Sequence, residues 1–394
     1  MTSRREFLSG SATAMGLAMW PDTVVAQATP VKIGFITTLS GPGGYIGEDI
    51  RDAFRLAVEQ GQGRLGGVPV EVIVEDDGLK PAQAKTVVER MLKRNGVKLF
   101  SGIVFSNILA AVVPDVLDAG GFYVSPNAAP STFAGRNCHK NFFAIAWQND
   151  TLHETAGLAA NELGYKRAAI LAPNYQAGKD ALTGFRRTFK GEIAAEIYTR
   201  LDQTDFASEL AQIRAARPDM VFQFHPGGLG IAFIRQYAQA GLAQTVPMVV
   251  PESSLDSTIL AAVGDAALGI TATTHWNADF PGEANRAFVA AFQAKYNRLA
   301  TVFASQSFET ALAIGAALRA VDGDLSQADA FRAAMLKADF PAIRGAFSFG
   351  PNQHPVQDWW VIKVEKGADG KPVLVTRQKI ATGYGDSYAA TCRL

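Results

Sequence analysis

The segment from Val31 to Gly78, VKIGFITTLSGPGGYIGEDIRDAFRLAVEQGQGRLGGVPVEVIVEDDG, decides the fold class of this chain. Lys32–Thr38 and Val68–Glu75 are short apolar runs, which are typical of strands that are buried on both faces. Glu48–Gln60 lies between them, and its apolar residues recur at the spacing of an amphipathic helix. A strand, a helix and a second strand in this order predict a β-α-β unit with parallel strands.

The same alternation continues along the chain in two series. The first series runs to Ser125, and the pattern restarts after Asp150. Residues 283–336 are mostly helical in pattern, and a short antiparallel addition is expected near the end. Two successive series predict an α/β protein with two doubly wound parallel-sheet lobes. In the second series we expect strands at Ala168–Ala172, Glu196–Arg200, Met220–Phe224, Pro247–Val250 and Gly269–Thr274, and in the addition at Gly345–Phe349, Asp358–Val364 and Val373–Arg377.

Residues 1–28 have the pattern of an export signal. Arg4 and Arg5 precede an apolar stretch at Ala12–Trp20, and Ala26-Gln27-Ala28 offers a small-residue cleavage site. The paired arginines are typical of a twin-arginine signal, so we expect a periplasmic protein. The alternative is a chance Arg-Arg pair at the start of a cytosolic protein. The predicted cleavage site has no cysteine, so no lipid anchor is expected.

Composition excludes several classes of partner. The chain has 394 residues, and its 37 lysines and arginines balance its 37 aspartates and glutamates. The basic residues are scattered along the sequence, which argues against binding to nucleic acid or to an anionic membrane surface. After Trp20 there is no apolar run of about 18 residues, so we expect no membrane-spanning helix in the mature chain.

The chain has two cysteines, Cys138 and Cys392. Because an exported protein meets an oxidising compartment, an even pair of cysteines predicts a disulfide. This bond would join the C-terminal tail to a loop in the middle of the chain. His139 beside Cys138 leaves a metal site as an alternative, but the ligand spacing is not that of a tetrahedral site. We therefore expect neither a metal nor a cofactor.

Six segments follow the predicted strands and are rich in glycine, proline, serine and asparagine. Open α/β sheets bind ligands beyond the carboxyl ends of their strands, and helix N-termini there favour a carboxylate. Any one such loop also occurs wherever a strand turns into a helix, so the set of six is what indicates a binding site. The six segments are Leu39–Tyr45, Phe105–Asn107, Ser125–Pro130, Pro173–Gly178, His225–Gly228 and Pro251–Ser254.

The sequence resembles type I periplasmic solute-binding proteins of the branched-chain amino-acid transporter family. The resemblance begins in the segment from Val31 and covers nearly the whole mature chain. It continues through SGIVFSN, FYVSPNAAPST, APNYQAGKDALTGF, ARPDMVFQFHPGG and AAVGDAALGI. Within the family, Ala146–Asp150 together with PNYQAGKDALTGF and PGG resembles the branch that carries aromatic carboxylic acids.

The resemblance implies an architecture and a partner. Two lobes would be joined by three crossing strands and would close on the ligand by a hinge. One lobe would comprise residues 30–147 with 277–341, and the other residues 148–276 with 342–394. The partners would be a small carboxylate ligand and an inner-membrane ABC permease, and we expect the protein to be a monomer.

The resemblance also implies ligand residues. In amino-acid binders of the family, a serine after the third strand and backbone N–H groups after the fourth hold the ligand carboxylate. Here Ser106 matches the first position, and Asn127, Ala128 and Ala129 match the second; the hydroxyl residue usual near Ala129 is missing. The second lobe of the family supplies a tyrosine and a glutamate. The matching residues of this chain are Tyr175 and Glu252.

The glutamate is informative because its usual partner is the ligand ammonium group. Glu252 therefore argues against a purely acidic ligand, since a buried carboxylate without a cation is costly unless it is protonated or otherwise satisfied. Four further candidates are aromatic or histidine side chains. Trp147 and Trp276 lie at the predicted crossings, where each either stacks on a ligand ring or packs the hinge. His225 is a candidate donor to a carboxylate or phenol, or a loop histidine; Tyr45 ends the first glycine-rich loop.

Three classes of function remain to be compared. The first is an exported solute receptor for an aromatic acid, with a branched-chain or other aliphatic amino acid as the alternative ligand. The second is an exported enzyme, but the sequence has no nucleophile elbow, HExxH, CxxC or strand-linked GxGxxG motif. His153 and Glu154 are neighbours that point apart on a helix, so they make a poor acid–base pair. The third is a sensor module with the same ligand. We predict a receptor and not an enzyme.

Overall fold

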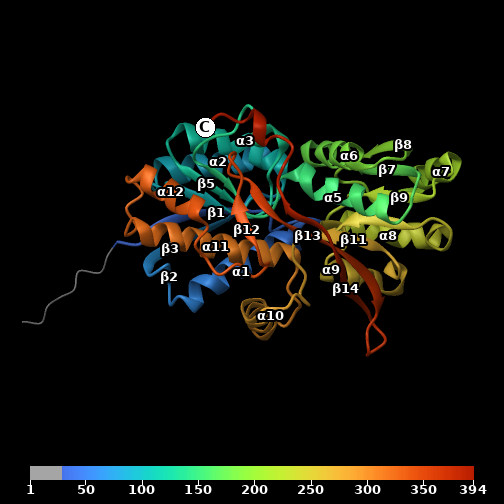
Figure 1. Cartoon of the computed structure of the whole chain (residues 1–394). Coiled ribbons are helices and arrows are strands. Elements are labelled where there is room, and N and C mark those ends of the chain that lie inside the picture. Colours follow the sequence, from blue (N-terminus) through green and yellow to red (C-terminus); the bar gives the residue numbers. More distant parts are fainter. Residues whose placement is uncertain (1–28) are drawn as a thin grey trace, which may run out of the picture.

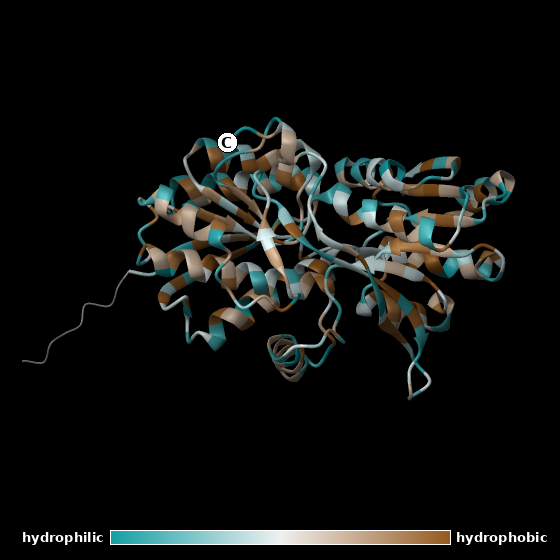
Figure 2. Cartoon of the chain, viewed as in Figure 1, coloured by the Kyte–Doolittle hydropathy of each residue, from teal (hydrophilic) through white to brown (hydrophobic). Residues whose placement is uncertain are grey.

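The computed structural model describes residues 29–394, which form two α/β lobes lying side by side (Figure 1). The predicted export signal at residues 1–28 lies outside the described residues. Each lobe is built around one sheet in which five consecutive strands are parallel. Figure 2 shows that hydrophobic residues concentrate in these sheets, while hydrophilic residues gather on the outer turns. The predicted fold class is therefore confirmed.

The first sheet has six strands in the order β2-β3-β1-β4-β5-β6, of which only the β2–β3 pair is antiparallel. Helices pack on both faces, including three from late in the sequence. The strands are β1 Val31–Thr37, β2 Arg64–Leu65, β3 Val68–Asp76, β4 Leu99–Ser101, β5 Phe122–Ser125 and β6 Phe142–Ala144. The helices are α1 Gly44–Gln60, α2 Pro81–Lys93, α3 Ser106–Asp118, α4 Ser131–Ala134, α10 Glu283–Tyr296, α11 Val302–Ala320 and α12 Ala328–Lys337.

The second sheet has eight strands in the order β12-β13-β11-β10-β9-β7-β8, with β14 paired to β13. Strands β7 to β11 are parallel, and the last three strands are the predicted antiparallel addition. The strands are β7 Arg167–Pro173, β8 Glu192–Thr199, β9 Met220–Gln223, β10 Met248–Pro251, β11 Thr271–Thr274, β12 Phe347–Phe349, β13 Pro355–Lys366 and β14 Pro372–Tyr384. The helices are α5 Asn149–Glu162, α6 Gln176–Thr188, α7 Ala207–Ala216, α8 Gly228–Gln239 and α9 Ser257–Val263, with short 3-10 turns η1 Leu242–Gln244, η2 Glu252–Ser254, η3 Gly264–Ala267 and η4 Ala389–Thr391.

The glycine-rich loop after β1 is explained by close packing. Helix α1 begins at Gly44, four residues before the predicted start, and its first turn lies against the end of β1. A Cβ atom at Gly47 would overlap the carbonyl oxygen of Thr38, so only glycine fits there. Strand β4 ends at Ser101, because Gly102 takes a φ of +105° and turns the chain out of the sheet.

Three segments connect the lobes. Two are irregular, namely residues 145–148 between β6 and α5 and the chain that leaves β11 after Thr274. The third is β13, which is long enough to contribute to both cores: Trp359 packs in the core of the first lobe, while Ile362 and Val364 pack in that of the second. Strand β13 is longer than the expected Asp358–Val364, because the apolar residues alone do not reveal its polar ends.

The buried side chain of Arg344 connects the first and third of these crossings. The guanidinium of Arg344 donates to the carbonyl oxygens of Ile145 and Ala146 at 2.8 and 3.1 Å, and to the side chain of Gln357 in β13 at 2.7 Å. It also forms an ion pair with Glu309 of α11, whose side chain is fully buried. Because a buried charge without a partner is costly, this cluster holds the first and third crossings in one relative position.

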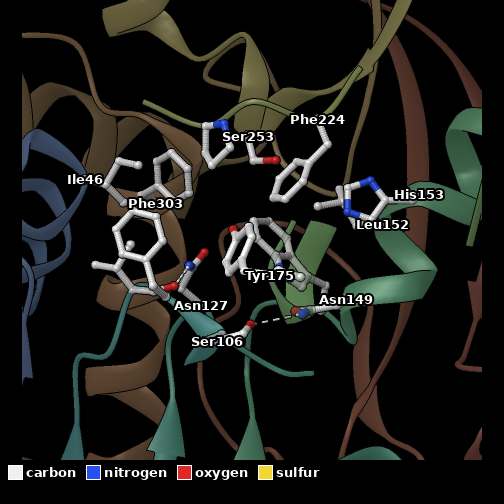
Figure 3. Close-up of a pocket in the computed structure, with 16 residues that line it drawn as sticks. Ile46, Ser106, Asn127, Asn149, Leu152, His153, Tyr175, Phe224, Ser253 and Phe303 are labelled. Atoms are coloured by element: carbon white, nitrogen blue, oxygen red, sulfur yellow. Dashed lines mark hydrogen bonds between the residues drawn. The ribbon is translucent and has the colours of Figure 1, made fainter. Parts of the chain in front are cut away.

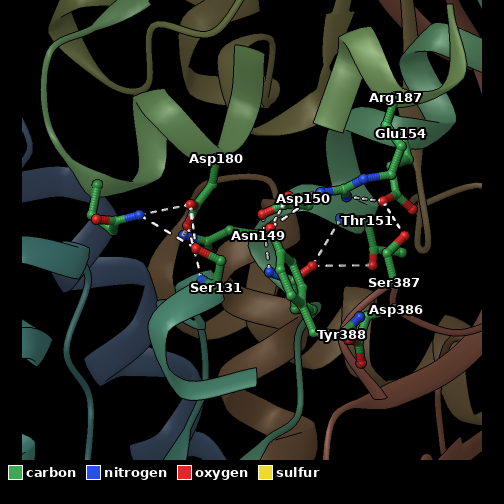
Figure 4. Close-up of polar contacts among 12 residues, drawn as sticks. Ser131, Asn149, Asp150, Thr151, Glu154, Asp180, Arg187, Asp386, Ser387 and Tyr388 are labelled. Carbon is green, nitrogen blue, oxygen red and sulfur yellow. Dashed lines mark hydrogen bonds and ion pairs between the residues drawn. The ribbon is translucent and has the colours of Figure 1, made fainter. Parts of the chain in front are cut away.

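The C-terminal tail runs from the second lobe back to the first. Its end is fixed by the predicted disulfide between Cys138 and Cys392, which is confirmed. On the way, the tail covers two buried carboxylates of α5 (Figure 4). The hydroxyl of Tyr388 donates to Asp150 at 2.8 Å, and that of Ser387 donates to Glu154 at 2.7 Å. Arg187 of α6 pairs with both carboxylates and supplies the counter-charge.

We predict that the disulfide stabilises the folded protein by restricting the unfolded chain. The bond joins residues 254 positions apart, for which the chain-entropy relation gives an upper figure of about 5 kcal/mol. Replacing both cysteines by serine should lower the free energy of unfolding by about 2–5 kcal/mol in chemical denaturation. Reduction of the wild type should have the same effect. Equal stability of the oxidised wild type and the double variant would contradict this role.

Candidate functional site

A cavity with an empty volume of about 410 Å³ lies between the lobes, at the carboxyl ends of both parallel sheets (Figure 3). In each lobe the strand order reverses at this edge, between β1 and β4 and between β7 and β9, where open α/β sheets bind ligands. The lining residues are Ile46, Val104, Phe105, Ser106, Asn127, Ala128, Trp147, Asn149, Leu152, His153, Tyr175, Ala177, Phe224, Pro226, Ser253 and Phe303.

Two helices begin at the cavity, one from each lobe. Ser106 is the first residue of α3, and Tyr175 immediately precedes α6. Neither helix has a side chain that caps its first N–H groups, so these donors and the positive end of each helix dipole remain available. The two ends approach each other closely, with the rings of Phe105 and Tyr175 6.3 Å apart. Together they form an environment suited to a carboxylate.

The serine at the start of α3 is oriented by an amide. Asn149 donates from Nδ2 to Ser106 Oγ at 3.1 Å, so the serine oxygen accepts and its own proton stays available for donation. The same Nδ2 donates to Asp180 of α6 at 3.1 Å, and Asn149 Oδ1 accepts from the backbone N–H of Ala129 at 3.1 Å. One side chain therefore connects both helix ends and the loop after β5.

Five aromatic side chains form much of the wall: Phe105, Trp147, Tyr175, Phe224 and Phe303. The rings of Tyr175 and Phe224 are nearly parallel, with centroids 6.5 Å apart and an interplanar angle of 13°. Trp147 lies edge-on to His275 at 5.5 Å, which fixes the plane of its indole. Walls of this kind suit a flat aromatic ligand, which can contact ring faces and ring edges together.

None of the described residues that line the cavity carries a formal charge. The set contains no aspartate, glutamate, lysine or arginine, and burial lowers the pKa of His153 to about 3, so this histidine is neutral at physiological pH. Burial also raises the pKa of Tyr175, which stays a neutral hydroxyl donor. Among the groups at the cavity, the two helix N-termini therefore carry the positive partial charge, and no basic side chain contributes.

The cavity brings together five of the residues that were expected to bind a ligand. Ser106, Asn127 and Ala128 come from the first lobe, Trp147 from the first crossing and Tyr175 from the second lobe. The Asn127 amide is held by a bond from Nδ2 to the carbonyl oxygen of Val104 at 2.7 Å. The remaining five candidates do not line the cavity, and for them a ligand contact stays a prediction.

Glu252 lies behind the cavity wall, in the loop after β10. Its side chain is buried and accepts a hydrogen bond from the hydroxyl of Thr274. Burial raises the pKa of Glu252 well above its usual range, which favours the protonated carboxyl. Its neighbour Ser253 reaches the wall instead. In this conformation Glu252 does not present a carboxylate to a ligand ammonium group.

His225 and Trp276 are held inside the protein by other contacts. The ring nitrogens of His225 lie 3.0 Å from Thr199 Oγ1 and 2.8 Å from Gln223 Oε1, and its ring stacks on Phe233. Its neighbours Phe224 and Pro226 line the cavity. The indole N–H of Trp276 donates to Asn285 at 2.7 Å, which is the hinge-packing alternative considered above.

Ala129 and Tyr45 have interlobe partners. The backbone N–H of Ala129 is engaged by Asn149, as described above. The hydroxyl of Tyr45, in α1, donates to Asp256 at the start of α9 at 2.6 Å, so this bond joins the lobes beside the cavity. A second such bond links Ser131 to Asp180 at 2.7 Å. The lobes are therefore closed over the cavity.

Several residues that line the cavity were not among the ligand residues predicted from the sequence. Asn149 and His153 lie in α5. Asn149 was noted only as part of the segment Ala146–Asp150 that carries the family resemblance, and His153 only as a neighbour of Glu154. Ser253 lies in the loop Pro251–Ser254, which we predicted to border the site, but Glu252 was the residue of that loop that we expected to bind the ligand. Phe303 lies at the start of α11, far from the other site residues in sequence, and no local pattern indicates that it returns to the cleft.

A sequence profile of the family described as "Periplasmic binding protein" matches residues 30–371. The chain therefore belongs to the periplasmic binding protein family. Among curated relatives, the Leu/Ile/Val-binding protein homolog 6 of Brucella melitensis is 26% identical over 356 residues, which cover 88% of this chain and 90% of that protein. The relatives agree with the resemblance to the branched-chain amino-acid transporter family.

Solved structures are similar over most of the chain. A solute-binding protein of an ABC transporter from R. palustris, in complex with benzoate, has a TM-score of 0.87 and 29% identity, and the match covers 93% of this chain and 100% of that one. Another from R. palustris, in complex with 4-hydroxybenzoate, has a TM-score of 0.83 and 25% identity, with coverage of 90% and 98%. The family and fold of this chain are thus those of ABC-transporter solute-binding proteins, which bind small molecules and work with membrane permeases.

Two other features are absent from residues 29–394. No helix there combines the length and the apolar character needed to cross a membrane. In the same residues, no group of three or more histidine, cysteine, aspartate or glutamate side chains is placed to hold a metal ion.

We predict that Asp256 makes the folded protein less stable as the pH rises. Burial raises its pKa from 3.8 to about 7, so the folded protein binds more protons at this carboxyl than the unfolded chain does between about pH 4 and 7. Stability contributed by the protonated form is therefore present at about pH 4 and is lost as the pH rises to 7. For each additional proton that the folded state binds, the free energy of unfolding falls by about 1.4 kcal/mol per pH unit.

Asp256→Asn should remove this slope while keeping the caps to Thr258 and Ile259. In chemical denaturation, the stability of the wild type relative to this variant should fall by about 1 kcal/mol per pH unit over that interval. Asp202→Asn, at a side chain that is 84% exposed, is the matched control and should show no such trend. A pH-independent difference for Asp256→Asn would contradict the prediction.

Proposed function

We propose that this protein is the periplasmic receptor of an ABC uptake transporter and that it binds a small aromatic carboxylic acid, of the benzoate, hydroxybenzoate or cinnamate type, in the cavity between the lobes. The observation that carries the proposal is the composition of the cavity. Two uncapped helix N-termini face aromatic walls, and among the described residues no acidic side chain lines the space.

The helix N-termini and Ser106 account for binding of the ligand carboxylate. Ser106 has an available O–H, and the first N–H groups of α3 and α6 have no capping side chain. Each helix terminus stabilises a nearby anion by about 0.3–1 kcal/mol at an exposed site and by up to about 2 kcal/mol in partly buried geometry. Hydrogen bonds to an ionised group add about 1.5–3 kcal/mol each. Such a site holds a carboxylate without a basic side chain.

The second candidate is a branched-chain or other aliphatic amino acid, which the names of the curated relatives favour. An amino acid brings an ammonium group, and burying that cation without a carboxylate partner is costly. The nearest candidate, Glu252, is bonded to Thr274 and does not reach the cavity wall. The composition of the cavity therefore favours an acid without an amino group.

We also propose how the lobes close on the ligand and where the protein delivers it. We divide the chain into residues 30–147 with 277–341 and residues 148–276 with 342–394, although the end of the tail returns to the first lobe at Cys138. A hinge at the crossings lets the lobes close on the ligand. The twin-arginine signal directs the chain to the periplasm, without a lipid anchor. There the protein acts as a monomer, delivers its ligand to an inner-membrane permease and catalyses no reaction. Turnover of the bound acid would contradict this part.

We predict that the mature protein binds benzoate in calorimetric titration and that Ser106→Ala weakens this binding by about ten-fold or more, because the charged carboxylate loses a hydrogen bond. Ser101→Ala is the matched control, since Ser101 bonds the carbonyl oxygen of Val124 inside the same lobe and does not line the cavity. Binding of leucine without binding of benzoate or any hydroxybenzoate or cinnamate would overturn the proposed ligand class.

A second prediction concerns Glu252→Gln. The exchange keeps an acceptor for Thr274 and removes only the carboxyl, so the affinity for benzoate should change by less than about three-fold. If the ligand is an amino acid whose ammonium group pairs with Glu252, the same exchange should weaken binding by about a hundred-fold or more. A parallel titration with leucine distinguishes the two cases.

A further inference from the structure

Two polar side chains on the second-lobe side of the cavity are buried without a hydrogen-bond partner. Ser253 Oγ and His153 Nδ1 have none among residues 29–394, and their side chains belong to residues that are 2% and 1% exposed. Both residues line the cavity. Buried polar atoms in native proteins nearly always have a partner, so a pair of unsatisfied atoms beside an empty space indicates a group that a ligand supplies.

Ser253 and His153 lie apart from the residues that would hold the ligand carboxylate. Figure 3 shows Ser106 and Asn149 together at one end of the cavity, and Ser253 with Phe224 across the space from them, with His153 beside Phe224. His153 is held there by the edges of its aromatic contacts, at 4.8 Å from the ring of Phe224. A ligand whose carboxylate lies at Ser106 would therefore direct the opposite end of its ring toward Ser253 and His153.

The chemistry of the two side chains selects the group at that end. A serine hydroxyl both donates and accepts, and a neutral imidazole has one nitrogen of each kind. A phenolic hydroxyl also donates one hydrogen bond and accepts others, so it can satisfy either partner. A hydrogen or a methyl group on the ring would leave both unsatisfied, and sites built to bind a ligand hydroxyl strongly reject analogues that lack it.

The cavity holds one more unsatisfied atom, Asn127 Oδ1. The bond from Asn127 Nδ2 to Val104 fixes the amide so that this oxygen is an acceptor. It lies on the Ser106 side in Figure 3, where a carboxylate cannot donate to it, and it has no part in recognition at the opposite end.

We propose that Ser253 and His153 recognise a hydroxyl group on the aromatic ring, so that this protein binds a hydroxylated aromatic acid more tightly than the unsubstituted acid. This inference rests on the proposed function, because it requires the carboxylate to lie at the helix N-termini. It assigns specificity to two residues that the carboxylate site does not use.

The test is calorimetric titration of the mature protein with benzoate, 4-methylbenzoate and the 2-, 3- and 4-hydroxybenzoates. The tightest hydroxybenzoate should bind at least about ten-fold more tightly than benzoate and 4-methylbenzoate. Ser253→Ala should reduce this advantage to about three-fold or less. His153→Leu, which keeps an apolar contact to Phe224, should reduce it in the same way.

Ser254→Ala is the matched control. Ser254 is also buried, but its hydroxyl accepts from the backbone N–H of His225 and does not line the cavity, so the hydroxyl advantage should persist in this variant. Equal affinity of the wild type for benzoate and all three hydroxybenzoates would overturn the inference and leave the proposed function standing. So would an undiminished hydroxyl advantage in both Ser253→Ala and His153→Leu. Absence of binding to every aromatic acid would overturn the proposed function as well.

Discussion

The geometry of the cleft depends on the side-chain amide of Asn149. This residue is the first of α5, directly after the first crossing between the lobes. Its amide bonds Ser106 at the start of α3, Asp180 in α6 and the loop at Ala129. The amide thereby aligns a helix terminus of the first lobe with one of the second. Closure at this point is what turns two separate helix ends into one anion site, since each effect fades within about one turn.

The absence of charged side chains from the described cavity wall has a consequence for specificity. A basic residue would attract any anion, whereas helix dipoles and hydroxyl donors hold a carboxylate through directed hydrogen bonds. The aromatic wall then selects the remainder of the ligand by shape and apolar contact. Two groups of buried charges near the cleft are paired with arginines: Asp150 and Glu154 with Arg187 under the C-terminal tail, and Glu309 with Arg344 at the crossings. They support the frame of the site and do not enter it.

Local patterns were sufficient for the fold, because buried parallel strands and amphipathic helices have distinct periodicities. Ser106 and Tyr175 could be placed in the cleft because each follows a parallel strand, and the carboxyl ends of such strands share one edge. Phe303 could not be placed, because α11 reaches the cleft from a distant part of the chain. Nor could the short strands β2 and β6, which are too brief to show periodicity. The side-chain direction of Glu252 depends on its bond to Thr274, which no sequence pattern reveals.

The most direct measurement of the central claim is a crystal structure of the mature protein with benzoate bound. We expect both lobes closed on the ligand, its carboxylate oxygens within hydrogen-bond distance of Ser106 Oγ and of backbone N–H groups at the start of α3 or α6, and its ring between Trp147, Tyr175, Phe224 and Phe303. A benzoate bound outside this cavity, or one whose carboxylate points away from the two helix N-termini, would contradict the account.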